Sequence, residues 1–174
     1  MKISAVALVV AVVALVGSGC GGSESTQSSA EGLPGPVAET RSAILAAAES
    51  GEYEPLRDVV HPQSFLSDFG FRDEPDPVGR WEQMGSKPLE TMGTLLRMPH
   101  VVRETNEGTL YEWPQFNADS SAGDVSADER ELLLTIMTEE ELTNAFLPEY
   151  GYTGPRLGIL AEGDWWFFVS GGAP

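Results

Sequence analysis

Two histidines are the residues best suited to acid–base chemistry in this chain of 174 residues. His61 and His100 stand 39 residues apart, and each is next to a proline. An imidazole titrates near neutral pH, so either one can serve as a general base when a carboxylate orients it. Asp58 and Asp68 are the carboxylates that could pair most readily with His61. With 27 acidic residues in the chain, such a neighbour is also expected by chance. A structural or surface role for both histidines therefore stays open.

Aromatic residues gather on or beside the expected strands, where a curved sheet could collect them around a pocket for a ring or a sugar face. They are Tyr111, Trp113, Tyr150, Tyr152, Trp165 and Trp166. The alternative is that these large side chains simply form the core. Several arginines stand as scarce charges among apolar residues, and one or two could hold an anionic ligand in a cleft or pair with the surplus acids. They are Arg72, Arg80, Arg97, Arg103 and Arg156.

Other patterns that carry chemistry are missing from the sequence. It has no phosphate-binding loop, dinucleotide glycine fingerprint, zinc signature or nucleophile elbow. Four acids, Asp119, Asp124, Asp128 and Glu129, lie close together, but their spacing does not match a calcium-binding loop. We therefore expect no cofactor and no metal site.

The single cysteine, Cys20, ends a segment with the features of an export signal. Lys2 supplies a positive charge, Ile3 to Val16 form an apolar run, and Gly17-Ser18-Gly19 place three small residues directly before the cysteine. This segment resembles a bacterial lipoprotein signal, although such signals most often carry leucine where Gly17 stands. The resemblance implies that Cys20 receives a diacylglyceryl group on its sulfur and becomes the mature N-terminus after cleavage.

Two other interpretations of the first 20 residues stay open: an ordinary secretory signal and an uncleaved membrane helix. The apolar run ends at Gly17, short of the roughly 20 residues that a membrane span requires. We predict a signal peptide over residues 1–19, a lipidated cysteine with a flexible Ser/Gly/Pro tether over 20–36, and a single domain over 37–174. The expected location is the cell membrane, lipid-anchored on the extracytoplasmic face, or the outer membrane if the organism has one.

Charge narrows the range of partners. The chain carries a formal net charge of −17, and cleavage after residue 19 would remove Lys2 and leave nine basic against 27 acidic side chains. Nucleic-acid binding needs clusters of Lys and Arg, which this sequence lacks. The expected partners are the membrane, through the lipid on Cys20, and a protein or small molecule whose identity the sequence does not give. The acidic surface is also explained by solubility alone.

The residue patterns predict an α+β fold in which helices pack on a small antiparallel sheet. Proline and glycine punctuation, apolar spacing and two capping boxes predict helices, the last two of them opened by Ser126 and Thr138. The first four expected helices span 36–50, 54–60, 77–84 and 88–97. A hairpin is expected with strands at 101–105 and 109–113, followed by an acidic loop over 117–125.

The strongest strand signal lies near the C-terminus, where 156–160 and 165–169 flank a turn. Strict alternation would place Trp166 and Phe168 on one face and Trp165, Phe167 and Val169 on the other. Because both faces of this strand are apolar, we expect it to be central and covered on both sides.

The entry to the domain is an alanine-rich helix, the residues Ser50-Gly51-Glu52-Tyr53-Glu54 and a short Leu/Val helix. Over residues 37–60 it resembles the nuclear-transport-factor-like, polyketide-cyclase-like cone fold. That resemblance implies a curved antiparallel sheet wrapped around helices, with a pocket. The segment with Pro75 and Pro77 departs from the pattern.

Two functional hypotheses follow. The first is a lipid-anchored extracytoplasmic protein that binds a ligand or another protein. The second is a small cone-fold enzyme, a lyase, isomerase or hydrolase, that uses His61 or His100 with a carboxylate. A purely structural envelope protein is the third possibility. An enzyme of this kind requires a histidine and a carboxylate within hydrogen-bond reach in an apolar pocket.

Overall fold

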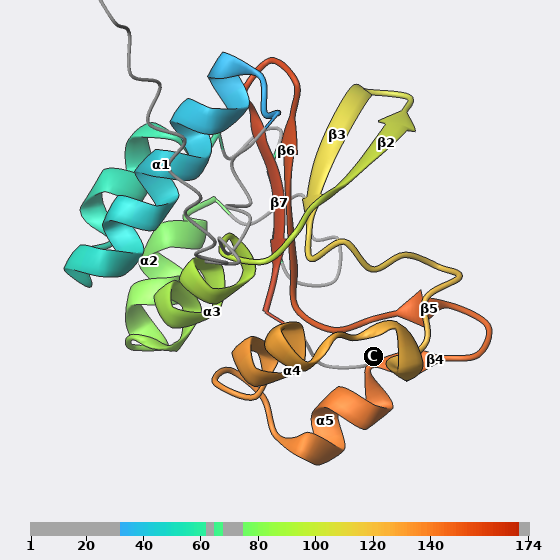
Figure 1. Cartoon of the computed structure of the whole chain (residues 1–174). Helices are drawn as coiled ribbons and strands as arrows, with labels where there is room; N and C mark the ends of the chain where they lie inside the picture. The colour runs from blue at the N-terminus through green and yellow to red at the C-terminus, as the bar shows by residue number, and fades with distance from the viewer. Residues whose placement is uncertain (1–31, 62–64, 68–74, 171–174) are drawn as a thin grey trace, which may run out of the picture.

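The computed structural model describes residues 32–61, 65–67 and 75–170. These residues form a single compact α+β arrangement, as expected (Figure 1). The helical segments are α1 (Gly35–Ser50), η1 (Glu54–Asp58), α2 (Pro77–Gln83), α3 (Lys87–Leu95), η3 (Ala122–Asp124), α4 (Ala127–Leu133) and α5 (Glu139–Asn144). The strands are β1 (Leu66–Ser67), β2 (Val101–Thr105), β3 (Gly108–Trp113), β4 (Phe146–Leu147), β5 (Gly151–Tyr152), β6 (Arg156–Leu160) and β7 (Trp165–Val169).

Local sequence signals set the ends of the first helices. Helix α1 ends at Gly51, whose φ of 73° is the left-handed conformation that glycine adopts without strain. The side chain of Asp76 accepts a hydrogen bond from the backbone N–H of Gly79 (2.9 Å) and so caps α2. The helix expected over 54–60 is instead the short 3₁₀ helix η1, which ends at Asp58.

Both expected capping boxes form at the start of α4 and α5. Ser126 and Thr138 accept hydrogen bonds from the backbone N–H groups of Glu129 and Glu141, and these two glutamates accept from the capping residues in return. Such reciprocal bonds satisfy N–H groups that would otherwise lack partners at a helix start. The predicted break between the two helices is therefore confirmed.

Five strands form the main sheet in the order β1-β7-β6-β3-β2. Four of them are antiparallel, as predicted, and the expected hairpin pairs Thr105 with Gly108 and Val101 with Glu112. Strand β1, which the sequence did not predict, pairs in parallel with β7 through Leu66 and Phe167. β4 and β5 make a separate two-stranded sheet that was also not predicted. Strand β7 therefore lies inside the sheet, between β1 and β6.

The predicted alternation along β7 is wrong because the strand contains a bulge. Trp165 lies opposite Ile159 and Phe167 lies opposite Gly158, so Trp166 is an extra residue that no residue of β6 faces. Trp165 and Phe168 consequently share one face of the sheet. Phe167 and Val169 lie on the other.

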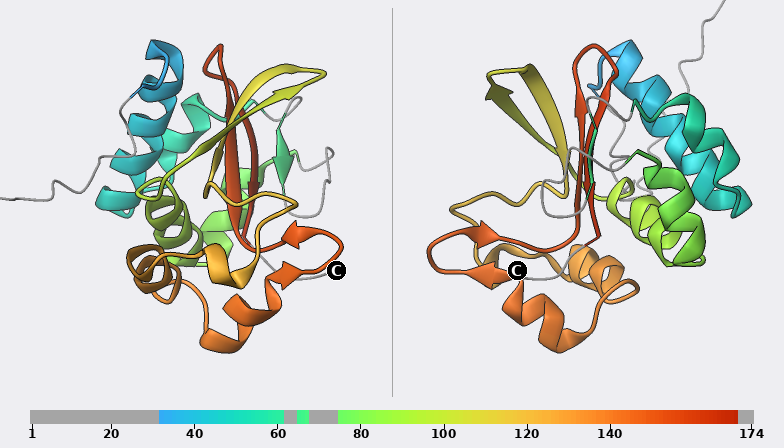
Figure 2. Two further views of the ribbon diagram at one scale, coloured as in Figure 1. Left: turned by 45° about the vertical axis from the view of Figure 1, so that its right-hand side comes forward. Right: turned by 180° about the vertical axis from the view of Figure 1, so that it is seen from behind.

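One face of the sheet is covered by helices. Helices α1, α2 and α3 lie on the same side of β6 and β7 in all three ribbon views (Figures 1 and 2). The main core lies between these layers, and Trp113, Trp165 and Phe168 are each 0 % exposed there. An aromatic cluster joins Trp165 to Phe65 and Trp81, with ring centroids 5.2 and 5.5 Å away. Burial on this scale is the main source of the domain's stability.

The other face carries a second and smaller cluster, formed by Leu110, Leu160 and Phe167. No helix lies over it in the described part of the chain, and the β2–β3 hairpin curves outward above it (Figure 1). We call this side the open face. Among the described residues, no helix is both long and apolar enough to cross a membrane.

Candidate functional site

A groove of about 440 Å³ lies on the open face, within the size range of small-molecule sites. Its apolar lining comes from Leu66 on β1, Leu110 on β3, and Phe167 and Val169 on β7. Half-buried Trp166 and buried Phe116 add aromatic surface. The groove thus depends on strands that are far apart in the sequence and adjacent in the sheet.

The strand register explains why the groove also contains charged side chains. Residues that alternate along a strand share a face, as do partners across strands. Leu110 lies opposite Arg103 and two residues before Glu112, so all three occupy the open face. In the same way Arg156 lies opposite Val169 and shares its face. Three charges are therefore placed beside the apolar lining.

Arg103 and Glu112 form an ion pair, with 2.7 Å between the arginine Nε and the glutamate Oε2. Arg103 also donates a hydrogen bond from Nη2 to the carbonyl oxygen of Phe116 (3.2 Å). Glu112 is only 8 % exposed. Burial raises the pKa of its carboxyl group, while the nearby guanidinium groups of Arg103 and Arg156 act in the opposite direction. The charge of Glu112 is therefore matched locally by Arg103.

Arg156 has no comparable partner. Its Nη1 donates a hydrogen bond to the carbonyl oxygen of Tyr152 (3.2 Å), which fixes the side chain at the groove. Within the described residues no carboxylate oxygen lies within 4.0 Å of its guanidinium nitrogens. Arg156 therefore presents a positive charge that no described residue neutralises through a direct ion pair.

Tyr150 and Tyr152 form the aromatic side of the groove near the β4–β5 sheet. The ring of Tyr152 packs against Phe116 and Phe146, with centroids 5.2 and 5.0 Å away. Its buried hydroxyl has no hydrogen-bond partner among the described residues, and burial raises the pKa of this hydroxyl. Tyr150 is 66 % exposed and lies at the rim.

Gly158 is the residue of β6 over which the Phe167 ring lies. A Cβ atom at this position would come within 2.4 Å of Cε1 of Phe167. Real side chains do not approach so closely, so any larger residue here would displace the ring from the groove. Glycine at position 158 therefore leaves room for the Phe167 ring in the floor of the groove.

The structure places the predicted ligand-binding residues on two different faces. Trp166 and Arg156 line the groove. Trp113 and Trp165 are fully buried on the helix-covered face, because alternation and the bulge direct them inward. Tyr111 also lies on that face, with its ring centroid 5.7 Å from that of His100. A ligand in the groove would therefore contact Trp166 and Arg156 but not Trp113, Trp165 or Tyr111. Tyr150, Tyr152 and Arg103, which the sequence also offered as pocket or anion-binding residues, line the groove as well.

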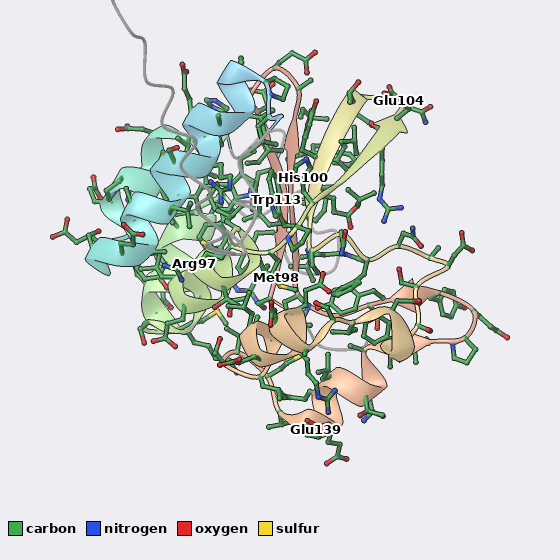
Figure 3. The ribbon with its side chains drawn as sticks, viewed as in Figure 1. Arg97, Met98, His100, Glu104, Trp113 and Glu139 are labelled. Atoms are coloured by element: carbon green, nitrogen blue, oxygen red, sulfur yellow. The ribbon has the colours of Figure 1, made fainter. Side chains whose placement is uncertain are left out.

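Neither histidine lines the groove. His100 stacks near Trp113, with 5.3 Å between ring centroids, at the start of β2 (Figure 3). His61 is exposed and follows η1, which ends at the exposed Asp58. Asp68, the other proposed partner of His61, and Cys20, the proposed lipidation site, lie outside the described residues. No group of three or more potential metal ligands occurs in the part of the chain that the structure describes.

Sequence reasoning missed Glu112, Leu66 and Phe116 as groove residues. A signal for Glu112 was present, because a glutamate two positions after Leu110 in a strand must share its face. Leu66 and Phe116 gave no such signal, since one lies in a two-residue strand and the other in a loop.

A second cavity of about 310 Å³ lies between the start of α3 and the segment around α5. Lys87, Met137, Glu141 and Thr153 are among the residues that line it, and no aromatic side chain does so. The groove on the open face is larger and combines aromatic, apolar and charged groups. It is therefore the stronger candidate for a binding site.

Comparison of the chain with protein-family models, with curated proteins and with solved structures finds no match. The resemblance of residues 37–60 to the cone fold stays a prediction.

Proposed function

We propose that this protein is a lipid-anchored extracytoplasmic protein that binds a ligand in the groove of the open face. The observation that carries the proposal is the contrast within one sheet. One face is closed by helices, while the other carries a groove of about 440 Å³ with aromatic rings and an arginine that lacks an ion pair in the described part of the chain. Sites of this composition bind small molecules or short segments of proteins.

The anchor in this proposal rests on the sequence before Cys20. An acyl modification there would hold the protein at the membrane, since each buried methylene contributes about 0.8 kcal/mol and two or more chains give stable attachment. The cell membrane is the proposed location, and the outer membrane is the alternative where one exists. A protein or a small molecule is the proposed partner, besides the membrane itself.

Binding is favoured over catalysis because of the groups that line the groove. Among the described residues that line it, the charged groups are one ion pair, Arg103 with Glu112, and the arginine Arg156. The proposed general bases His61 and His100 lie elsewhere. The described residues that line the groove include no histidine, so the groove does not supply the histidine–carboxylate pair that the cone-fold enzyme requires.

The anchor can be tested by acyl labelling of the full chain in a bacterium with lipoprotein processing. The wild-type protein should incorporate an alkyne-labelled fatty acid, and Cys20→Ala should abolish the label. Ser23→Ala, which leaves the cysteine in place, is the matched control and should keep it. Absence of label on the wild type, or label that persists on Cys20→Ala, would contradict the lipid anchor.

The groove can be tested through the fluorescence of Trp166 in the full chain. Trp81, Trp113 and Trp165 are buried, so the difference between the spectra of the wild type and Trp166→Phe reports on the groove alone. The probe is 4-phenylbutanamide, a neutral molecule with an aromatic ring. It should change the Trp166 signal saturably and protect it from quenching by acrylamide.

Two exposed side chains provide matched variants for this titration. Tyr150 lies at the groove rim, whereas Met84, which is 47 % exposed, follows α2 and does not line the groove. Tyr150→Ala should weaken binding of the probe by at least about threefold, in line with the loss of one aromatic contact. Met84→Ala should leave binding unchanged. A Trp166 signal that does not respond to the probe would contradict the proposed function.

A further inference from the structure

The apolar and charged parts of the groove occupy different positions, which limits the chemistry of a ligand that fills both. Leu66 on β1 and Phe167 on β7 lie on adjacent strands, and Leu110 lies on β3, beyond β6. The three side chains belong to one apolar cluster, which forms the floor of the groove. Arg156 lies at the first position of β6, opposite Val169 at the last position of β7. A ligand that covers the floor can therefore reach the guanidinium with one end.

The charges of the described residues that line the groove do not cancel. Two arginines and one glutamate line it, and Arg103 is bound directly to Glu112 at 2.7 Å. The remaining positive charge belongs to Arg156. This local excess is opposite in sign to the whole chain, which carries a net charge of −17. Complementarity of charge favours an anion at this position.

Within the described residues Arg156 forms no ion pair, although the chain carries 27 acidic side chains. By comparison, the exposed Arg57 forms ion pairs with three carboxylates, those of Glu54, Asp76 and Glu82, all within 3.2 Å. Arg156 is half-buried, and its hydrogen bond to the Tyr152 carbonyl uses Nη1, which leaves other N–H groups of the guanidinium to donate. A guanidinium fixed in this way can bind a carboxylate through two parallel hydrogen bonds.

We infer that the groove selects small molecules that join an apolar or aromatic body to one anionic group, a carboxylate or a related oxyanion, and that Arg156 receives this group. The inference rests on the proposed function, since it names the ligand class of the same groove. The apolar body would lie on Leu110 and Phe167. Trp166 would contact its side.

The test compares two probes with the same apolar body, 4-phenylbutanoate and its neutral amide 4-phenylbutanamide, using the Trp166 signal of the full chain. The carboxylate should bind the wild type at least about tenfold more tightly than the amide, as expected for a charge-assisted pair. Arg156→Gln should reduce this preference to less than about twofold while it leaves binding of the amide intact. Arg156→Lys, which keeps the charge and loses the planar fork, should restore part of the preference.

Arg130→Gln is the matched control, because Arg130 is an exposed arginine on α4 that pairs with Glu139 and does not line the groove. It should keep the full preference for the carboxylate. A preference that survives Arg156→Gln would overturn the assignment of Arg156. Equal binding of the two probes to the wild type would overturn the anionic ligand class and leave the proposed groove function standing. Failure of both probes to change the Trp166 signal would overturn both.

Discussion

The two faces of the main sheet are built from the same strands and differ in almost every other respect. On the helix-covered face, Leu157, Ile159 and Trp165 are completely buried against α1–α3 and the aromatic cluster. On the open face, the same strands β6 and β7 carry Arg156, Trp166 and Phe167, which line a groove.

The difference shows how one sheet can separate stability from binding. Side chains alternate across a strand, so successive residues of β6 serve the two faces in turn. The bulge at Trp166 changes this pattern on β7 and adds an aromatic residue to the groove without removing Trp165 from the core. Substitutions on the two faces should therefore have separable effects on folding and on ligand binding.

The largest expected effect contrasts two adjacent tryptophans. Trp165→Ala should lower the free energy of unfolding by about 3–5 kcal/mol, because it opens a cavity in a fully buried site. Trp166→Ala should cost about 1 kcal/mol, since its side chain is only half-buried. Denaturant unfolding of both variants measures the contrast. Equal losses would show that the two faces contribute alike to stability.

A smaller effect is expected at Gly158, which lies on the open face opposite Phe167. Gly158→Ala should cost about 1–3 kcal/mol, because the new Cβ atom forces the Phe167 ring to move. The same substitution in a Phe167→Ala background should cost much less, since the obstructing ring is gone. A double-mutant cycle by denaturant unfolding measures this coupling. A coupling energy near zero would show that the position of the Phe167 ring does not depend on glycine at position 158.

The smallest expected effect concerns the charge on the open face. Burial raises the pKa of Glu112 above its value in the unfolded chain, so ionisation costs more in the folded state. The contribution of this carboxyl group to stability is therefore present at low pH and declines as the pH rises through its folded pKa. Relative to the wild type, Glu112→Gln should gain stability from about pH 4 upward.

Unfolding at a series of pH values measures this trend, and Glu104→Gln on the exposed part of β2 is the matched control. Arg103 on β2 and Arg156 on β6 are the charged groups that oppose the shift. A stability difference between Glu112→Gln and the wild type that does not change with pH would contradict the expected sign.

Local signals in the sequence predicted much of the fold. The capping boxes at Ser126 and Thr138 and the hairpin turn ending at Gly108 depend on residues within a few positions of each other, and all were confirmed. The bulge at Trp166 depends on how β7 pairs with β6, and residue alternation alone does not contain that information. β1, with two residues, is too short to produce a periodic pattern.

The groove was harder to predict than the elements that form it. Trp166 and Arg156 were named from the sequence, but residue type alone could not separate them from Trp113 and Trp165, which the sheet directs into the core. Leu66 and Glu112 join the site only because β1 and β3 flank the β6–β7 pair. The lipid on Cys20 and the boundary between the tether and the domain stay predictions.

The position of β7 in the sheet also has a consequence for the order of folding. β7 is the last described strand, and it pairs with β1, which lies early in the domain. The pairing of Leu66 with Phe167 closes a loop that contains most of the domain, and loops of this length close slowly. A chain made from its N-terminus completes α1–α3 before Trp165 exists to cover Trp81. We therefore expect the nascent protein to expose its apolar helix faces until β7 docks, which is the condition under which chains aggregate or engage chaperones.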